Sequence, residues 1–212
     1  MIRISIHSLR YKEISDIIKS LLQKNEIEYK EDSLDIKRQY DINIIEVKSI
    51  DDLYIIDKLK RNEETLIYII GPESFELANM CIKKNVHLYI IKNELNNEFN
   101  KNADDIIHHI QTRFQCYNYT RNGIESKMRL SHIQYIETLG HNIVIHSKSG
   151  QFVERKKLTS FLNEISSNDF IQIHKSYVVN KKHISKITGK DVTIKNGDIL
   201  PIGRVYKDAL KA

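Results

Sequence analysis

The chain has 212 residues, of which 41% are hydrophobic and 29% are charged, and its formal net charge is +5. This is the composition of a globular protein rather than of a disordered chain. No apolar run approaches the ~18 residues that a membrane helix needs, and the opening MIRISIHSLRYKE lacks the apolar core of a signal peptide. We therefore expect a soluble, cytoplasmic protein.

The charge is divided unevenly along the chain. Residues 1–105 contain 16 Lys and Arg against 20 Asp and Glu, whereas residues 106–212 contain 17 against 8, so the balances are −4 and +9. A basic sign confined to one half indicates that this half binds a polyanion. The sequence therefore predicts two domains.

Cysteine and histidine usage gives no sign of a metal centre. Cys81 and Cys116 form no CxxC pair, so neither a disulfide framework nor a zinc ribbon is indicated. Apart from the adjacent His108 and His109, no HExxH or His/Cys cluster occurs. We expect no metal, no cofactor and no catalytic residue, and the chain is not predicted to be an enzyme.

Short apolar runs alternate with helix-length stretches through the first half. Ile2, Ile4 and Ile6 recur at the strand period of two, and a stripe at helical spacing follows between Ile14 and Leu22. Further strands are predicted at 42–47, 66–70 and 86–91. This alternation favours an α/β fold with a mostly parallel sheet and helices on both faces.

This order of elements resembles the receiver domain of response regulators, a flavodoxin-like fold, over residues 1–113. Receivers hold Mg²⁺ with an acidic pair after the first strand and accept phosphate on an aspartate that ends the third. They use a Thr or Ser and a Lys after the fourth and fifth strands. The resemblance therefore implies a phosphoacceptor pocket at His7, Ser8, Glu46, Gly71 and Lys92.

Most of these positions depart from the receiver pattern. His7 and Ser8 replace the hard oxygen ligands that Mg²⁺ needs, and Glu46 stands in place of the aspartate. Gly71 has no side chain to donate a hydrogen bond, so only Lys92 matches its counterpart. Because these losses remove most of the stabilisation of a phosphoryl transition state, we expect a degenerate receiver without conventional aspartyl phosphorylation.

The sequence leaves open what Glu46 does instead. It can form an ion pair with Lys92 that imitates the activated state, or it can end its strand in water. Phosphotransfer through Glu46 or His7 is a further alternative.

The second half changes to strand composition. An apolar repeat from Ile106 to Phe114 predicts the last helix of the first domain, and we place a linker at 114–121 and the second domain at 122–212. Strands are predicted at 124–129, 132–138, 141–147 and 151–155, before a helix whose Leu158, Phe161, Leu162 and Ile165 face the core.

Two stretches near the end are informative. FIQIHKSYVVN, residues 170–180, predicts a strand that polar residues interrupt. Asn196-Gly197 lies between alternating strands, and both residues tolerate the positive φ of a type I′ hairpin turn. The second domain is therefore predicted to be mainly β.

Four blocks of this half, in order and with the expected gaps, carry a specific resemblance: IQYIETLGHNIVIHSKSG, LTSFL, FIQIHKSYVVNKKHISKI and IKNGDILPIGRVYKDAL. Over about residues 118–212 they resemble the LytTR DNA-binding domain. The resemblance implies a small, elongated β fold that lays loops, rather than a recognition helix, into successive major grooves of double-stranded DNA. The base-contacting positions of the family carry over to His141, Lys175 and Arg204.

The chemistry of these three residues suits base readout. Arg204 can donate two parallel hydrogen bonds to guanine O6 and N7, and Gly203 before it permits a close backbone approach. Lys175 can reach a base acceptor or a phosphate, and His141 can donate or accept through its ring. Without the resemblance, Arg204 would more often be a solvated surface charge. The corresponding alternatives are an exposed strand lysine for Lys175 and a turn residue with no ligand for His141.

Other polar residues of this half have different predicted roles. Alternation along the strand places His174 and Ser176 on the face away from Lys175, where we expect them, with Asn180, to hold the local backbone. Contacts to the DNA backbone are predicted for a set of basic residues in loops or at element ends: Lys148, Arg155, Lys156, Lys157, Lys181, Lys182 and Lys207.

Taken together, these patterns predict a sequence-specific transcription regulator that acts without aspartyl phosphorylation. A single domain of this size buries limited surface, so we expect a homodimer, paired through the receiver-like domain, on two half-sites about one helical turn apart. No small-molecule substrate and no membrane partner is expected. The alternative is an antagonist that forms a heterodimer with another response regulator.

Overall fold

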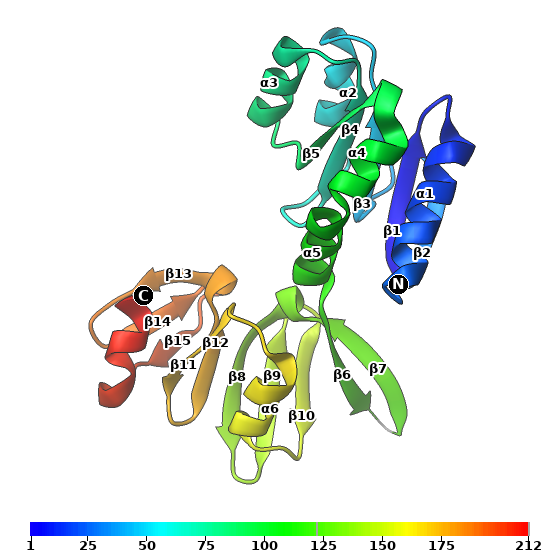
Figure 1. Ribbon diagram of the computed structural model, residues 1–212. Coiled ribbons are helices and arrows are strands. Elements are labelled where there is room, and N and C mark those ends of the chain that lie inside the picture. The colour runs from blue at the N-terminus through cyan, green and yellow to red at the C-terminus, as the bar shows by residue number, and fades with distance from the viewer. Residues whose placement is uncertain (122, 212) are drawn as a thin grey trace. The chain divides into compact units, whose positions relative to one another are not determined.

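The computed structural model describes residues 1–121 and 123–211, and the chain divides into two compact units (Figure 1). Unit 1 comprises Met1–Arg113 and unit 2 comprises Phe114–Ala212. Within the described part of the chain, every helix is too short or too polar to cross a membrane.

Unit 1 is built on a five-stranded sheet of order β2-β1-β3-β4-β5, in which every pair is parallel. The strands are β1 (Ile2–His7), β2 (Tyr29–Ser33), β3 (Ile42–Glu46), β4 (Leu66–Gly71) and β5 (Leu88–Ile91). The helices are α1 (Tyr11–Lys24), α2 (Tyr54–Lys58), α3 (Phe75–Lys83), α4 (Leu95–Lys101) and α5 (Ala103–Phe114), with the 3-10 turns η1 (Asp51–Leu53) and η2 (Lys92–Glu94).

The predicted α/β fold of unit 1 is confirmed. All six residues of β4 are buried, as a parallel strand covered on both faces requires. On one face, Leu53, Leu77 and Cys81 from the α2 and α3 side pack against Ile67 and Ile69. β2 gave no apolar signal because its sequence, YKEDS, is polar and it pairs with β1 alone at the edge of the sheet.

Unit 2 is mainly β, as predicted, and its largest sheet has the order β10-β9-β8-β12-β11. A three-stranded sheet, β13-β14-β15, and a two-stranded sheet, β6-β7, complete it. The strands are β6 (Cys116–Arg121), β7 (Ile124–Arg129), β8 (Ile133–Leu139), β9 (Asn142–Ser147), β10 (Gly150–Glu154), β11 (Phe170–His174), β12 (Tyr177–Asn180), β13 (Ile184–Ile187), β14 (Asp191–Ile194) and β15 (Ile199–Pro201). The helical elements are α6 (Leu158–Ile165), η3 (Leu130–His132), η4 (Lys181–His183) and η5 (Arg204–Lys211).

The large sheet of unit 2 is covered on both faces. On one face, Leu158, Phe161 and Ile165 of α6 are buried against residues such as Ile136 and Ile145. On the other face, Tyr135, Ile173 and Val179 pack against the three-stranded sheet. This second packing fixes the position of η5, which lies on β11.

Three local predictions differ from the structure. Residues 170–180 form a hairpin, β11 and β12, joined by the two-residue turn Lys175-Ser176, and not one strand. Residues 116–121, assigned to the linker, form strand β6. The hairpin at Asn196-Gly197 is present, but among the described residues only Gly197 of this pair has positive φ, at +98°, so the turn is not of type I′.

Candidate functional site

The predicted phosphoacceptor residues meet at the carboxyl edge of the unit 1 sheet. Glu46 ends β3 and Lys92 follows β5, and the Lys92 ammonium forms an ion pair with the Glu46 carboxylate. Only 5% of the Glu46 side chain is exposed, against 32% for Lys92. The alternative of a Glu46 carboxylate in water is therefore wrong, and the ion pair is formed.

A closed network surrounds this ion pair. The Ser8 hydroxyl donates to Glu46 and accepts from the Arg10 amide at 2.9 Å. The Arg10 guanidinium donates to the Lys92 carbonyl at 2.8 Å, so β1, β3 and β5 are tied together at their carboxyl ends. Burial by itself raises the pKa of Glu46, but the hydrogen bonds from Lys92 and Ser8 outweigh it, and the pKa is lowered.

Gly71 and His7 are the remaining predicted residues of this pocket. The Tyr89 hydroxyl donates to the Pro72 carbonyl at 2.6 Å, and it occupies the space that a Cβ at Gly71 would need. His7 is exposed and lines, with Ser8 and Asp52, a hollow of about 380 Å³ beside Glu46. Position 71 is therefore closed to a hydroxyl side chain unless Tyr89 moves.

In unit 2, two tight turns lie side by side at one end of the large sheet (Figure 1). The turn from β8 to β9 consists of Gly140 and His141, with φ +61° at Gly140, and the turn from β11 to β12 consists of Lys175 and Ser176. The Thr138 amide donates to the Ser176 carbonyl at 2.9 Å, which ties the end of β8 to the second turn. His141 and Lys175 are both exposed and line the same hollow. The structure therefore brings these two predicted residues together.

A hollow of about 590 Å³ lies between these turns and the start of α6. It is lined by His141 and Lys175, and by basic residues of the β10–α6 connection. Its other lining residues include three polar ones that sequence reasoning missed, because no spacing marks them: Thr138, Thr159 and Gln172.

Arg204 lies on the other side of the β11–β12 hairpin, as the first residue of η5. The Gly203 amide donates to the Ile173 carbonyl at 2.8 Å, and a Cβ at Gly203 would lie 2.9 Å from Tyr206 Cδ2 and 3.2 Å from His174 Cδ2. The missing side chain therefore serves the packing of η5 on β11. The close approach to DNA at Gly203 stays a prediction. Arg204 is exposed.

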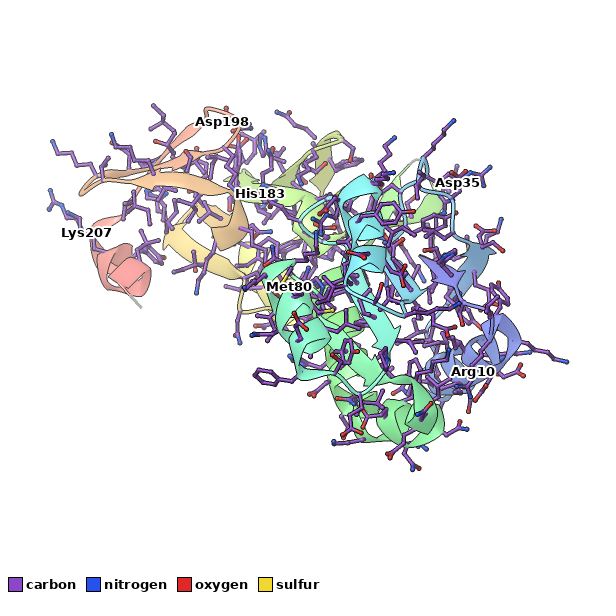
Figure 2. All side chains as sticks on the ribbon, turned by 90° about the horizontal axis from the view of Figure 1, so that it is seen from above. Arg10, Asp35, Met80, His183, Asp198 and Lys207 are labelled. Atoms are coloured by element: carbon purple, nitrogen blue, oxygen red, sulfur yellow. The ribbon has the colours of Figure 1, made fainter. Side chains whose placement is uncertain are left out.

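The predicted phosphate contacts separate into groups. Arg155 and Lys157 are exposed and line the hollow, and exposed Lys207 extends from η5 (Figure 2). Lys148, Lys181 and Lys182 lie instead at the opposite end of the large sheet, after β9 and β12. Lys182 also forms an ion pair with Asp169 at 2.6 Å.

Lys156 is partly buried, and its ammonium has several partners within unit 2. Its ammonium lies 2.9 Å from Glu154 and 2.6 Å from Glu164, and it donates to the Tyr117 hydroxyl at 2.7 Å. Burial alone lowers the pKa of Lys156, but these three hydrogen bonds raise it above its ordinary value. Lys156 therefore joins β6, β10 and α6, and its charge is already neutralised within the domain.

The residues predicted to hold the backbone do so in two cases. The Asn180 amide, which is buried, donates to the carbonyls of Leu130 at 3.3 Å and Ile133 at 2.9 Å. His174 Nδ1 accepts from the Ser176 amide at 3.2 Å, within the β11–β12 turn. Ser176 takes part in this hydrogen bond through its backbone amide.

No cluster of three or more His, Cys, Asp or Glu that could hold a metal ion occurs within residues 1–121 and 123–211. The turn end of unit 2 is the end of the large sheet that carries the turns Gly140-His141 and Lys175-Ser176. Its chemistry is that of a cationic, hydrogen-bonding surface.

Comparison with known families agrees with this surface. Residues 126–212 match the LytTr DNA-binding domain. The match indicates a DNA-binding transcription regulator, and the LytTr domain contains both turns, α6 and η5. The chain matches no curated protein.

Solved structures were also compared with the chain. The LytTr DNA-binding domain of a putative methyl-accepting/DNA response regulator from Bacillus cereus is 19% identical, with a TM-score of 0.41, over 45% of this chain and 93% of that one. A response regulator from Hahella chejuensis is 14% identical, with a TM-score of 0.41, over 54% and 96%. A pilus assembly protein CpaE from Caulobacter crescentus is 12% identical, with a TM-score of 0.40, over 50% and 99%.

Replacing Glu46 with Gln should make the stability of the protein less dependent on pH. The Glu46 pKa is lowered by folding, so the charged carboxylate stabilises the protein above its ordinary pKa of 4.5, and this stabilisation is lost as the pH falls through the lowered folded value. In urea unfolding near neutral pH, the free energy of unfolding of the wild type should exceed that of Glu46→Gln by about 1.5–3 kcal/mol. This difference should vanish in acid. A difference that stays constant with pH would contradict this network.

Replacing Lys156 with Met should destabilise unit 2, because Glu154 and Glu164 lose their shared cation. We expect a cost of about 1–3 kcal/mol, measured as faster amide hydrogen exchange in β6 and α6. Exposed Lys157 is the matched control, and Lys157→Met should change the exchange by less than about 0.5 kcal/mol. Equal effects of the two substitutions would show that the Lys156 ion pairs do not hold these elements together.

Proposed function

We propose that the protein is a sequence-specific DNA-binding transcription regulator that acts without aspartyl phosphorylation. The observation that carries the first part is the turn end of unit 2. Among the residues that line the hollow there, all of them within the described part of the chain, none is acidic, and Arg155, Lys157 and Lys175 are exposed. A surface of this kind attracts the phosphate backbone, and its protruding turns reach toward the base edges.

The roles of the residues follow from their positions. Lys175 and His141 stand on adjacent turns, and Arg204 stands at the start of η5, so these three contact base edges in the major groove. Arg155, Lys157 and Lys207 contact phosphates on either side. Lys148, Lys181 and Lys182, at the far end of the sheet, make no part of this interface.

Two copies of the chain bind together. One set of three base contacts discriminates few base pairs, and two domains on half-sites about one helical turn apart supply the rest. We assign the pairing to unit 1, whose charge balance differs from that of the DNA-binding unit.

Phosphorylation independence rests on the ion pair at the carboxyl edge of unit 1. Phosphoryl transfer to a carboxylate needs a metal ion and a free acceptor oxygen. The Glu46 carboxylate is engaged by Lys92 and Ser8, and its site offers a histidine and a serine where metal-binding carboxylates would be needed. The charge of Glu46 takes the place that a phosphoryl group would fill, and it holds Lys92 permanently.

DNA binding should respond differently to three kinds of substitution. With a duplex selected from a random pool, Lys175→Ala and Arg204→Ala should each weaken binding by roughly fivefold to 150-fold, with little change for unrelated duplexes. Lys157→Ala should weaken binding to every duplex and lower the slope of log affinity against log salt by about 0.9. Fluorescence anisotropy over a series of salt concentrations measures both effects.

The control for this experiment is Lys148→Ala, because Lys148 is an exposed lysine at the far end of the same sheet. It should leave the salt slope unchanged. If the purified chain selects no preferred duplex, the proposal is overturned. If it binds another response regulator instead, this result supports the alternative of a heterodimeric antagonist.

Incubation of the chain with acetyl phosphate and Mg²⁺ should leave its intact mass unchanged. A gain of one phosphoryl group that is lost in Glu46→Gln would show that Glu46 is still an acceptor. A gain that is lost only in His7→Ala would favour phosphotransfer through His7. A receiver domain with an intact acidic pair, phosphorylated in parallel, is the positive control.

A further inference from the structure

Two large apolar side chains are exposed beside the residues proposed to contact bases. Leu139, the last residue of β8, is 64% exposed and stands two positions before His141. Val205 follows Arg204 in η5 and is 87% exposed. Single exposed apolar residues are common on protein surfaces, so the location of these two, and not their exposure alone, is informative.

Leu139 and the element that carries Val205 are associated with one face of unit 2. Alternation along β8 places Leu139 on the same face as Tyr135, which packs against the three-stranded sheet in the cluster that also receives Leu210 of η5. Leu139 thus continues this face beyond its last buried residue, at the turn end. Val205 belongs to the element that lies on β11 at the same face.

The major groove offers one apolar feature to such side chains. Base edges there are hydrogen-bond donors and acceptors, except for the C5 methyl group of thymine. We propose that Leu139 and Val205 each pack against the methyl group of a thymine, next to the base pairs contacted by His141 and Arg204. This inference rests on the proposed function, and it adds that the operator carries thymines at two defined positions.

The size of the effect follows from the burial of one methyl group. Each contact removes about one CH₂ equivalent of surface from water, which favours thymine over a base without the methyl by roughly three- to fourfold. The contacts are therefore weaker than the bidentate contact of Arg204. They sharpen the site without dominating the affinity.

Replacement of thymine by deoxyuridine tests this directly, because uracil keeps the pairing and the O4 acceptor and lacks only the methyl. An operator is first selected from a random pool with the full chain, and each thymine is then replaced singly. Two positions per half-site should lose roughly three- to fourfold in affinity. Leu139→Ala should abolish the loss at one position, and Val205→Ala at the other.

Ile199→Ala is the matched control, because Ile199 is an apolar residue of β15 that is 67% exposed. The adjacent hairpin lies near Gln134 at the start of β8, away from the turn end, as the 3.3 Å contact from Asn196 shows. This variant should keep both uridine effects.

The two possible failures are distinguishable. If no duplex is selected, the proposed function itself falls. If an operator is selected but uridine is neutral at every position, or if its effects persist in Leu139→Ala and Val205→Ala, the DNA-binding function stands and the methyl contacts are overturned.

Discussion

The antiparallel pairing of β8 with β12 is the interaction on which the candidate interface depends. These strands are distant in the sequence. Their register, with Tyr177 opposite Glu137, places the turns of two hairpins at the same end of the large sheet. A slip of one residue would turn every side chain of β12 to the other face and would separate Lys175 from His141. Asn180, at the far end of β12, opposes such a slip, because its buried amide is matched to the carbonyls of Leu130 and Ile133.

Much of the fold could be predicted from apolar periodicity, because burial imposes that period on the sequence. The strands β3 and β4 and the buried face of α6 are examples. The β11–β12 hairpin escaped prediction because its turn, Lys175-Ser176, contains no Gly, Asn or Pro and lies between apolar residues on both strands. Here tertiary pairing with β8 overrides weak local turn chemistry.

The composition of the candidate site could be predicted only in part, since a basic residue carries no sign of its neighbours. Lys156 and Lys157 are adjacent in the sequence, yet one is neutralised by Glu154 and Glu164 while the other is exposed. The same limit applies to Glu46. Its proximity to Lys92 and Ser8 follows from the shared carboxyl edge of parallel strands, but the hydrogen bond from the Ser8 hydroxyl that completes the network could not be predicted from the sequence.

The tightness of the two turns affects the entropic cost of the proposed DNA binding. Ordering one flexible backbone residue costs about 1–2 kcal/mol, and fixing a long side chain costs about 0.5–1.5 kcal/mol more. His141 and Lys175 stand on two-residue turns, and the Thr138–Ser176 hydrogen bond ties the end of β8 to the second of them. The proposed binding would therefore have to order their side chains but not their backbones. Arg204 reaches a similar state by another route, because Gly203 leaves room for Tyr206 of η5 and for His174 of β11. The three side chains therefore start from fixed backbone positions, which is the condition for short loops to read base edges without a recognition helix.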